Sequence, residues 1–279
     1  MSFDKLYFGT AGIPLSTKDP TTIEGIKRVA ELGLGGMELE FVHNVNLSER
    51  SAPLVKKAAL DVGVNLTCHG QYYINLNAEE KEKMDASRER VIHAARIAAL
   101  AGAKSMTFHA GFYVGETPKK TFDDIKEQFE IILGEMKKQK IAITIRPETT
   151  GKGTQFGSLE ELLKLCSELD NVLPCIDFSH LHARSNGKYN TYKEFCNVLE
   201  QSKSALGKDF LNNLHCHVSG IEYTAKGERR HLPLEKSDFN YKDLMKALAG
   251  FDCKGVIVCE SPIIEEDALL MKKTFESFK

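Results

Sequence analysis

The feature that most constrains this chain is a regular alternation of short apolar segments with amphipathic, helix-type segments, repeated eight times. Short continuous apolar runs are typical of strands buried on both faces of a parallel sheet. Such runs lie at residues 6–9, 37–41, 64–68, 104–108, 141–145, 172–176, 210–218 and 255–259. Strands alternating with helices predict an α/β fold with right-handed crossovers. Eight such units, without a linker between them, predict one (β/α)8 TIM barrel domain over residues 1–279.

The segments between these strands carry helix signals. The longest spans residues 78–101, with an apolar stripe on one face and Gly102 as its terminator. Ser158 and Glu161 have the spacing of a capping box at the start of another helix. The remaining helices are expected at residues 21–32, 53–62, 122–138, 158–169, 189–204, 241–248 and 265–278.

Composition narrows the function classes. A net charge of −2 gives no global basic field for nucleic acid, although a local patch would suffice. The seven cysteines are scattered, without a CxxC pair, which favours a reducing, cytoplasmic compartment. The sequence shows no basic-then-apolar leader and no apolar run of membrane-spanning length, so no membrane partner is expected. No obligate protein partner is evident.

Six predicted strands end in a potential metal ligand. These residues are His69, His109, Glu148, Asp177, His215 and Glu260. The carboxyl ends of barrel strands meet at one rim, so the six side chains are expected to converge there. Imidazole and carboxylate ligands without thiolate suit a catalytic zinc, manganese or iron. Six ligands exceed the need of one zinc, so two metals bridged by Glu148 are expected, as in displacement at phosphorus.

Seven segments resemble, in order, the signature segments of the endonuclease IV family, which are apurinic/apyrimidinic endonucleases on a xylose isomerase-like barrel. They are LTCHGQYYINL (66–76), TFHAGFYVG (107–115), RPETTGKGTQFG (146–157), CIDFSHLHA (175–183), LHCHVSG (214–220), RHLPLE (230–235) and VIVCESP (256–262). The E-x-T-G-x-G-x-x-x-G pattern at 148–157 is specific. The resemblance covers nearly the whole chain.

The resemblance implies three zinc sites. The first would use His69, His109 and Glu148. The second would use Glu148, Asp177, His215 and Glu260. The third would include His180 and His231, but Arg229 stands where the family has an aspartate. Glu228 would replace it if the loop shifts by one residue, and His182 and His217 are additional imidazoles that could compensate.

The resemblance further implies damaged double-stranded DNA as the partner. Glu148 would be the catalytic residue in hydrolysis of the phosphodiester 5′ to an abasic site, with Zn²⁺ or another divalent ion such as Mn²⁺. Tyr72 matches a position that inserts at the lesion. The loop at residues 41–50 does not carry the fuller set of basic residues expected of the family's DNA-recognition loop. Local positive charge for phosphates would come from Arg146, Lys152, Arg184, Arg229 and Arg230.

Two other functions remain open. A sugar isomerase or epimerase of the same barrel type needs one divalent metal, for which Glu148, Asp177, His215 and Glu260 would serve equally well. The additional histidines exceed that need. A catalytically impaired DNA-damage binder that lost its third metal is the other alternative, and fold alone does not choose among the three.

Overall fold

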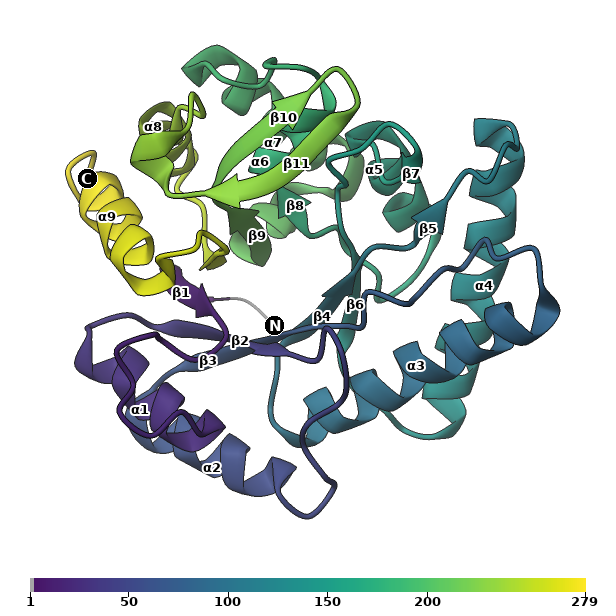
Figure 1. Cartoon of the computed structure of the whole chain (residues 1–279), viewed down its shortest axis with the longest axis horizontal. Helices are drawn as coiled ribbons and strands as arrows, with labels where there is room; N and C mark the ends of the chain where they lie inside the picture. Colours follow the sequence, from purple (N-terminus) through teal and green to yellow (C-terminus); the bar gives the residue numbers. More distant parts are fainter. Residues whose placement is uncertain (1–2) are drawn as a thin grey trace.

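A computed structural model describes residues 3–279. Its centre is an eight-stranded parallel sheet in the order β6-β4-β3-β2-β1-β12-β9-β8 (Figure 1). The strands are β1 (Leu6–Ala11), β2 (Gly36–Glu40), β3 (Asn65–His69), β4 (Ser105–Phe108), β6 (Thr144–Pro147), β8 (Ile176–Asp177), β9 (Leu214–Val218) and β12 (Gly255–Cys259). All eight lie in segments that the sequence predicts as strands, apart from shifts at their ends.

Hydrogen bonds between β6 and the segment just before β8 close the sheet into a barrel. Leu173 donates its backbone N–H to the carbonyl of Ile145 (3.1 Å), and Cys175 donates to that of Pro147 (2.9 Å). Pro174 has no N–H to donate, which explains why the regular strand here shortens to two residues. The α/β barrel expected from the sequence is confirmed as the fold.

Helices surround the outside of the sheet (Figure 1). They are α1 (Thr22–Glu31), α2 (Ala52–Val62), α3 (Lys81–Leu100), α4 (Pro118–Lys138), α5 (Leu159–Glu168), α7 (Tyr192–Leu206), α8 (Tyr241–Gly250) and α9 (Ile264–Glu276). The predicted capping box is present, because Ser158 and Glu161 each bond the other's backbone. None of the helices in the described part of the chain is long and apolar enough to cross a membrane.

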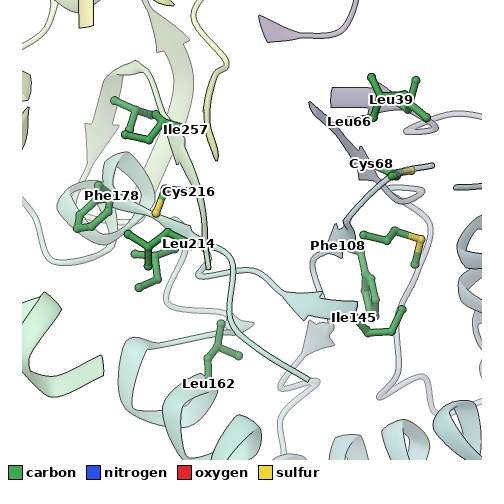
Figure 2. Packing of buried hydrophobic residues seen from close by; sticks show 14 of the residues in the cluster. Leu39, Leu66, Cys68, Phe108, Ile145, Leu162, Phe178, Leu214, Cys216 and Ile257 are labelled. Carbon is green, nitrogen blue, oxygen red and sulfur yellow. The ribbon is translucent and has the colours of Figure 1, made fainter. Parts of the chain in front are cut away.

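Buried hydrophobic residues fill the space between the sheet and the helices. Figure 2 shows part of this core, including Phe108 and Ile145 from neighbouring strands and Leu162 from α5. Arg146 also lies in the interior, only 1% exposed, where it donates to the backbone carbonyls of Pro174 and Asn213. Its expected place on a rim loop is therefore wrong, because its side chain spans the barrel interior.

Three short pieces outside the barrel strands were not expected from the sequence. Helix α6 (Phe178–Arg184) follows β8 directly, and the antiparallel hairpin of β10 (Gly220–Thr224) and β11 (Gly227–Leu232) follows β9. A small antiparallel pair joins β5 (Gly111–Phe112) to β7 (Gln155–Phe156). All three follow the carboxyl ends of barrel strands, so they lie on the side that carries the metal-ligand candidates.

Candidate metal centre

The candidate ligands converge at the carboxyl ends of the parallel strands. His69 is the last residue of β3 and Asp177 the last of β8, while His109, Glu148 and Glu260 follow β4, β6 and β12. Glu148, Asp177 and His69 are each at most 3% exposed. Charged side chains are rarely buried this far unless they are paired or bind a cation. The rim therefore concentrates charge that needs a partner.

The first group consists of His69, His109 and Glu148, whose ligand atoms lie within 4.8 Å of one another. His69 Nε2 is 3.3 Å from Glu148 Oε2, and His109 Nε2 is 3.3 Å from Glu148 Oε1. His69 Nδ1 contacts the carbonyl oxygen of Gly70 at 2.7 Å. That contact fixes Nδ1 as the protonated nitrogen and leaves the Nε2 lone pair free for a metal.

The second group consists of Glu148, Asp177, His217 and Glu260, again with ligand atoms within 4.8 Å. His217 Nδ1 lies 3.2 Å from Glu260 Oε1 and 3.4 Å from Glu148 Oε1. Glu148 Oε1, Asp177 Oδ2 and His217 Nδ1 are buried without a hydrogen-bond partner. Buried polar atoms are nearly always paired, so three unpaired ligand atoms in one group fit a divalent cation.

The second group contains His217, whereas the sequence analysis assigned His215. The two side chains point into the barrel from the same strand, because residues two apart in a strand share a face. His215 lies one layer deeper in the barrel, with its ring centre 5.1 Å from that of His217. His215 Nε2 there contacts Glu38 Oε1 at 3.0 Å, and its Nδ1 contacts Ser105 Oγ at 3.0 Å.

The third group consists of His180 from α6 with Glu228 and His231 from β11. His180 Nδ1 contacts the carbonyl of Thr149 (3.0 Å), and His231 Nδ1 contacts that of Glu260 (3.0 Å). Each histidine thus leaves Nε2 facing Glu228, at 3.5 and 3.9 Å. The arrangement of His69 is repeated, with Nδ1 on a backbone carbonyl and Nε2 free.

A β-bulge explains why Glu228, not Arg229, joins this group. Glu222 pairs with Arg230 while Tyr223 pairs with Glu228, so β11 carries one extra residue at Arg229. The extra residue reverses the side-chain alternation and brings Glu228 to the face of His231. Arg229 is exposed and pairs with Glu222. The expectation that Glu228 replaces the family's aspartate agrees with this geometry.

Two glycines, Gly151 in the loop after β6 and Gly227 in the hairpin, allow the hairpin to pack closely against that loop. Glu228 donates its N–H to the carbonyl of Gly151, and a Cβ on Gly151 would lie 2.6 Å from Glu228 Cβ and 3.1 Å from His180 Cδ2. Gly227 has a φ of +92°, and a Cβ there would lie 2.2 Å from the oxygen of Gly151. Glycine at these positions is what the close contact requires.

Replacing Glu228 by alanine should lower metal affinity at the third group, since only two histidines would remain there. We expect the loss of one tightly bound metal equivalent under dilute conditions. The matched variant Arg229→Ala should keep full metal content, because that side chain points away from the group. Metal analysis after dialysis measures both. Equal metal loss in the two variants would contradict the bulge-based assignment.

His182 does not join any of the three groups. It lies on the short helix α6, where residues two apart point in nearly opposite directions, unlike in a strand. His182 Nε2 lies 3.2 Å from Asp238 Oδ1, and Tyr223 donates to Asp238 Oδ2 at 2.8 Å. His182 therefore contacts residues of the hairpin and of the segment after it, on the side away from the metal-ligand groups. The sequence had suggested it as an additional metal ligand.

The charges of the groups are set by their mutual contacts. Burial opposes ionisation of Glu148, but His217 and His109 outweigh it and hold the pKa of Glu148 well below its usual value. Burial likewise opposes the charge on His69, yet contact with Glu148 raises the pKa of His69 to about 10. Burial raises the pKa of Glu260 to about 8. Without metal, protons on imidazoles thus balance part of the carboxylate charge.

Sequence reasoning missed two acidic residues of β2, Glu38 and Glu40. Full burial opposes ionisation of Glu38, but the imidazoles of His217 and His215 outweigh it and hold the pKa of Glu38 below its usual value. Burial raises the pKa of Glu40 to about 7. The available signal was the segment MELEF, in which two carboxylates alternate with apolar residues inside a buried strand. A carboxylate at such a position needs a specific partner.

The surroundings of the rim differ in part from expectation. Tyr72 lies beside the first group, with its ring centre 5.6 Å from that of His69, and is 60% exposed. Arg184 does not face solvent freely, because it donates to the carbonyls of Lys152 and Gln155. Arg230, like Arg229, pairs with Glu222. Of the expected phosphate-binding residues, Lys152 remains an exposed cation next to the third group.

Comparisons with known proteins agree with the fold. The sequence model of a family described as a xylose isomerase-like TIM barrel matches residues 26–279. The uncharacterized protein MJ0133 of Methanocaldococcus jannaschii is 45% identical over 97% of this chain and 97% of its own length. An endonuclease 4 homolog of Dictyostelium discoideum is 26% identical over 62% of this chain. A probable endonuclease 4 of Oceanobacillus iheyensis is 31% identical over 46% of this chain.

The matched regions cover only 33% and 42% of those two endonuclease relatives. Two solved structures superpose over nearly the whole chain. A D-tagatose 3-epimerase-like protein gives a TM-score of 0.74 at 16% identity, covering 98% of this chain and 96% of its own. Endonuclease IV from Thermus thermophilus gives 0.73 at 18% identity, covering 97% and 98%. The sequence matches confirm the resemblance to the endonuclease IV family. The two structural likenesses, at less than 25% identity, show only the fold.

Proposed function

Because the chain belongs to the xylose isomerase-like TIM barrel family, we propose that it is a metal-dependent apurinic/apyrimidinic endonuclease of the endonuclease IV type. It would hydrolyse the phosphodiester 5′ to an abasic site in damaged double-stranded DNA. Zn²⁺ is the proposed metal, because histidine and carboxylate groups of three or four ligands suit it. The scattered free cysteines fit a reducing, cytoplasmic compartment.

The observation that carries this proposal is the presence of three histidine–carboxylate groups on one rim. The first and second share Glu148, and His180 of the third lies 3.3 Å from the same carboxylate. A single-metal isomerase has no use for the first and third groups. Adjacent divalent ions are a standard device for phosphodiester hydrolysis, where they stabilise the attacking and leaving oxygens.

The chain's own residues would act as follows. Metals at these groups would supply Lewis acidity and lower the pKa of water. His69 of the first group and both histidines of the third group contact backbone carbonyls through Nδ1, so these three rings are oriented before substrate arrives. Glu148, buried and shared between groups, keeps the two sets of ligands at a fixed spacing. Tyr72, exposed beside His69, would fill the space next to the lesion.

A second function is favoured by one specific observation. The second group is a Glu, Asp, His and Glu set, which alone would hold the single metal of a sugar epimerase. An epimerase-like protein also superposes on this chain. Under this alternative the histidines of the first and third groups would be dispensable, so their removal would leave activity intact. That difference separates the two proposals.

The deciding experiment is single-turnover incision of a labelled duplex carrying one abasic site. Metal-reloaded and chelator-stripped protein are compared, with an undamaged duplex as the control. Cleavage 5′ to the lesion by the reloaded protein alone would support the proposal. Intact DNA at full metal occupancy would reject it, and epimerisation of ketohexoses is then the reaction to measure.

Tyr72→Ala should lower the rate of incision of abasic DNA without changing the metal content of the protein. Stacking of an aromatic ring on a base contributes about 1–3 kcal/mol, so incision at limiting enzyme should fall by roughly tenfold. Tyr72→Phe should retain most activity because the ring remains. Tyr192→Ala, which removes an exposed tyrosine from α7 on the outside of the barrel, should behave as the wild type. Unchanged incision by Tyr72→Ala would exclude this role.

A further inference from the structure

His217 is held differently from the other histidines of the centre. His69, His180 and His231 each contact a backbone carbonyl through Nδ1, leaving Nε2 toward the ligand group. In His217 the two nitrogens are exchanged, because Nδ1 faces Glu148 and Glu260 while Nε2 faces the barrel interior. The group facing Nε2 is a carboxylate, Glu38, whose Oε2 lies 2.7 Å away, within ion-pair distance but without the alignment of a hydrogen bond in this structure.

Glu38 is placed to make this contact by its position in β2. Its side chain is fully buried beneath the rim, and its other oxygen, Oε1, lies 3.0 Å from His215 Nε2. His215 is in turn held by Ser105, whose Oγ is 3.0 Å from Nδ1. The result is a continuous line of side chains from Ser105 through His215 and Glu38 to His217.

We propose that Glu38 is a positioning residue that holds the proton of His217 on Nε2, so that the Nδ1 lone pair is presented to a divalent metal in the second group. An imidazole has two nitrogens, and the partner of one decides which lone pair the other offers. A carboxylate partner also raises the basicity of the coordinating nitrogen. Glu38 touches neither metal nor substrate in this role and acts through His217.

His215 has a matching task in this arrangement. A buried carboxylate with a single partner would keep unsatisfied lone pairs at a substantial cost in free energy. The imidazole of His215 supplies a second N–H near Glu38, and the Ser105 hydroxyl is available to the remaining nitrogen. His215 therefore fixes the orientation of Glu38, which explains the presence of an imidazole one layer below the ligands.

The inference rests on the metal centre of the proposed function, but not on its DNA substrate. Nuclear magnetic resonance of the Zn²⁺-loaded protein, with ¹⁵N-labelled histidine, shows which nitrogen of His217 carries a proton. We expect a proton on Nε2 and none on Nδ1. A proton on Nδ1, with Nε2 coordinating, would overturn the inference without any variant being made.

The second measurement is zinc affinity by competition with a chromophoric chelator. Glu38→Gln should weaken one zinc equivalent by roughly 10- to 100-fold, the usual effect of removing a carboxylate behind a metal-binding histidine. The first and third groups should keep their affinity. Ser105→Ala, which changes only the contact to His215, should have a smaller effect. Melting of the metal-free variants serves as the control for folding.

The outcomes separate this inference from the proposed function. Unchanged zinc affinity in a folded Glu38→Gln variant would overturn the positioning role, even if the wild type cleaves abasic DNA. A lower melting temperature without a change in zinc affinity or in the proton position would show a purely structural role. Normal zinc binding and the expected proton position, together with intact abasic DNA, would reject only the endonuclease.

Discussion

Replacing Glu148 by glutamine is expected to reduce incision of abasic DNA by at least about a thousandfold. The amide keeps the shape of the side chain but loses the charge that two ligand groups share. Charge stabilisation by a metal contributes several kcal/mol in the transition state, and about 4 kcal/mol corresponds to a thousandfold in rate. Single-turnover incision at saturating enzyme measures the effect on the chemical step.

The same substitution should lower metal content at both groups that include Glu148, which metal analysis of the purified variant tests. Glu160→Gln is the matched control, because it removes an exposed carboxylate at the start of α5 near the same loop. That variant should keep both metal and activity. A Glu148→Gln protein that cleaves at the wild-type rate would exclude any catalytic role for this residue.

The barrel was predictable because its signal repeats. Each unit pairs a short apolar strand with an amphipathic helix, and an error in one unit does not change the topology of the other seven. The convergence of side chains at strand ends, such as His69 and Glu148, was predictable for a related reason. Parallel strands deliver their carboxyl ends to one rim, so position in the strand nearly determines position in space.

The remaining features depend on contacts that local pattern does not encode. His215 and His217 share a strand face, and only the pairing register of β9 with its neighbours determines which reaches the rim. Glu228 reaches the third group only because a bulge adds Arg229 to β11. Glu38 is a carboxylate in an apolar strand, and the two histidines that pair with it lie about 180 residues away in the sequence.

The metal-free protein should lose stability as pH rises from about 6 to 9. Burial raises the pKa of Glu40 to about 7 and of Glu260 to about 8, so their protonated forms are favoured in the folded state. This contribution is complete below about pH 4.5 and is lost as pH rises through those values. Against the opposing effect of burial, Glu148 raises the pKa of His69 to about 10. The His69 contribution is complete below about pH 6.5 and declines up to pH 10.

Acid should destabilise the metal-free protein as well. Burial lowers the pKa of His215 to about 4, so this contribution is present above about pH 6.5 and is lost as pH falls toward 4. The lowered pKa of Glu148 acts in the same direction below about pH 4.5. Thermal melting of chelator-treated protein from pH 4 to pH 9 should therefore show a maximum near pH 6.

Added Zn²⁺ should stabilise the protein increasingly over the range in which the metal-free form weakens. Metal binding requires deprotonated imidazoles and carboxylates, so it releases the protons that these groups otherwise hold. At a free metal concentration a thousand times Kd, each site adds about 4 kcal/mol to the free energy of unfolding. The metal-induced rise in melting temperature should thus be larger at pH 8 than at pH 6. The control variant Arg229→Ala should show the same pH dependence as the wild type. An equal rise in melting temperature at pH 6 and pH 8 would show that metal binding does not release protons from these histidines and carboxylates.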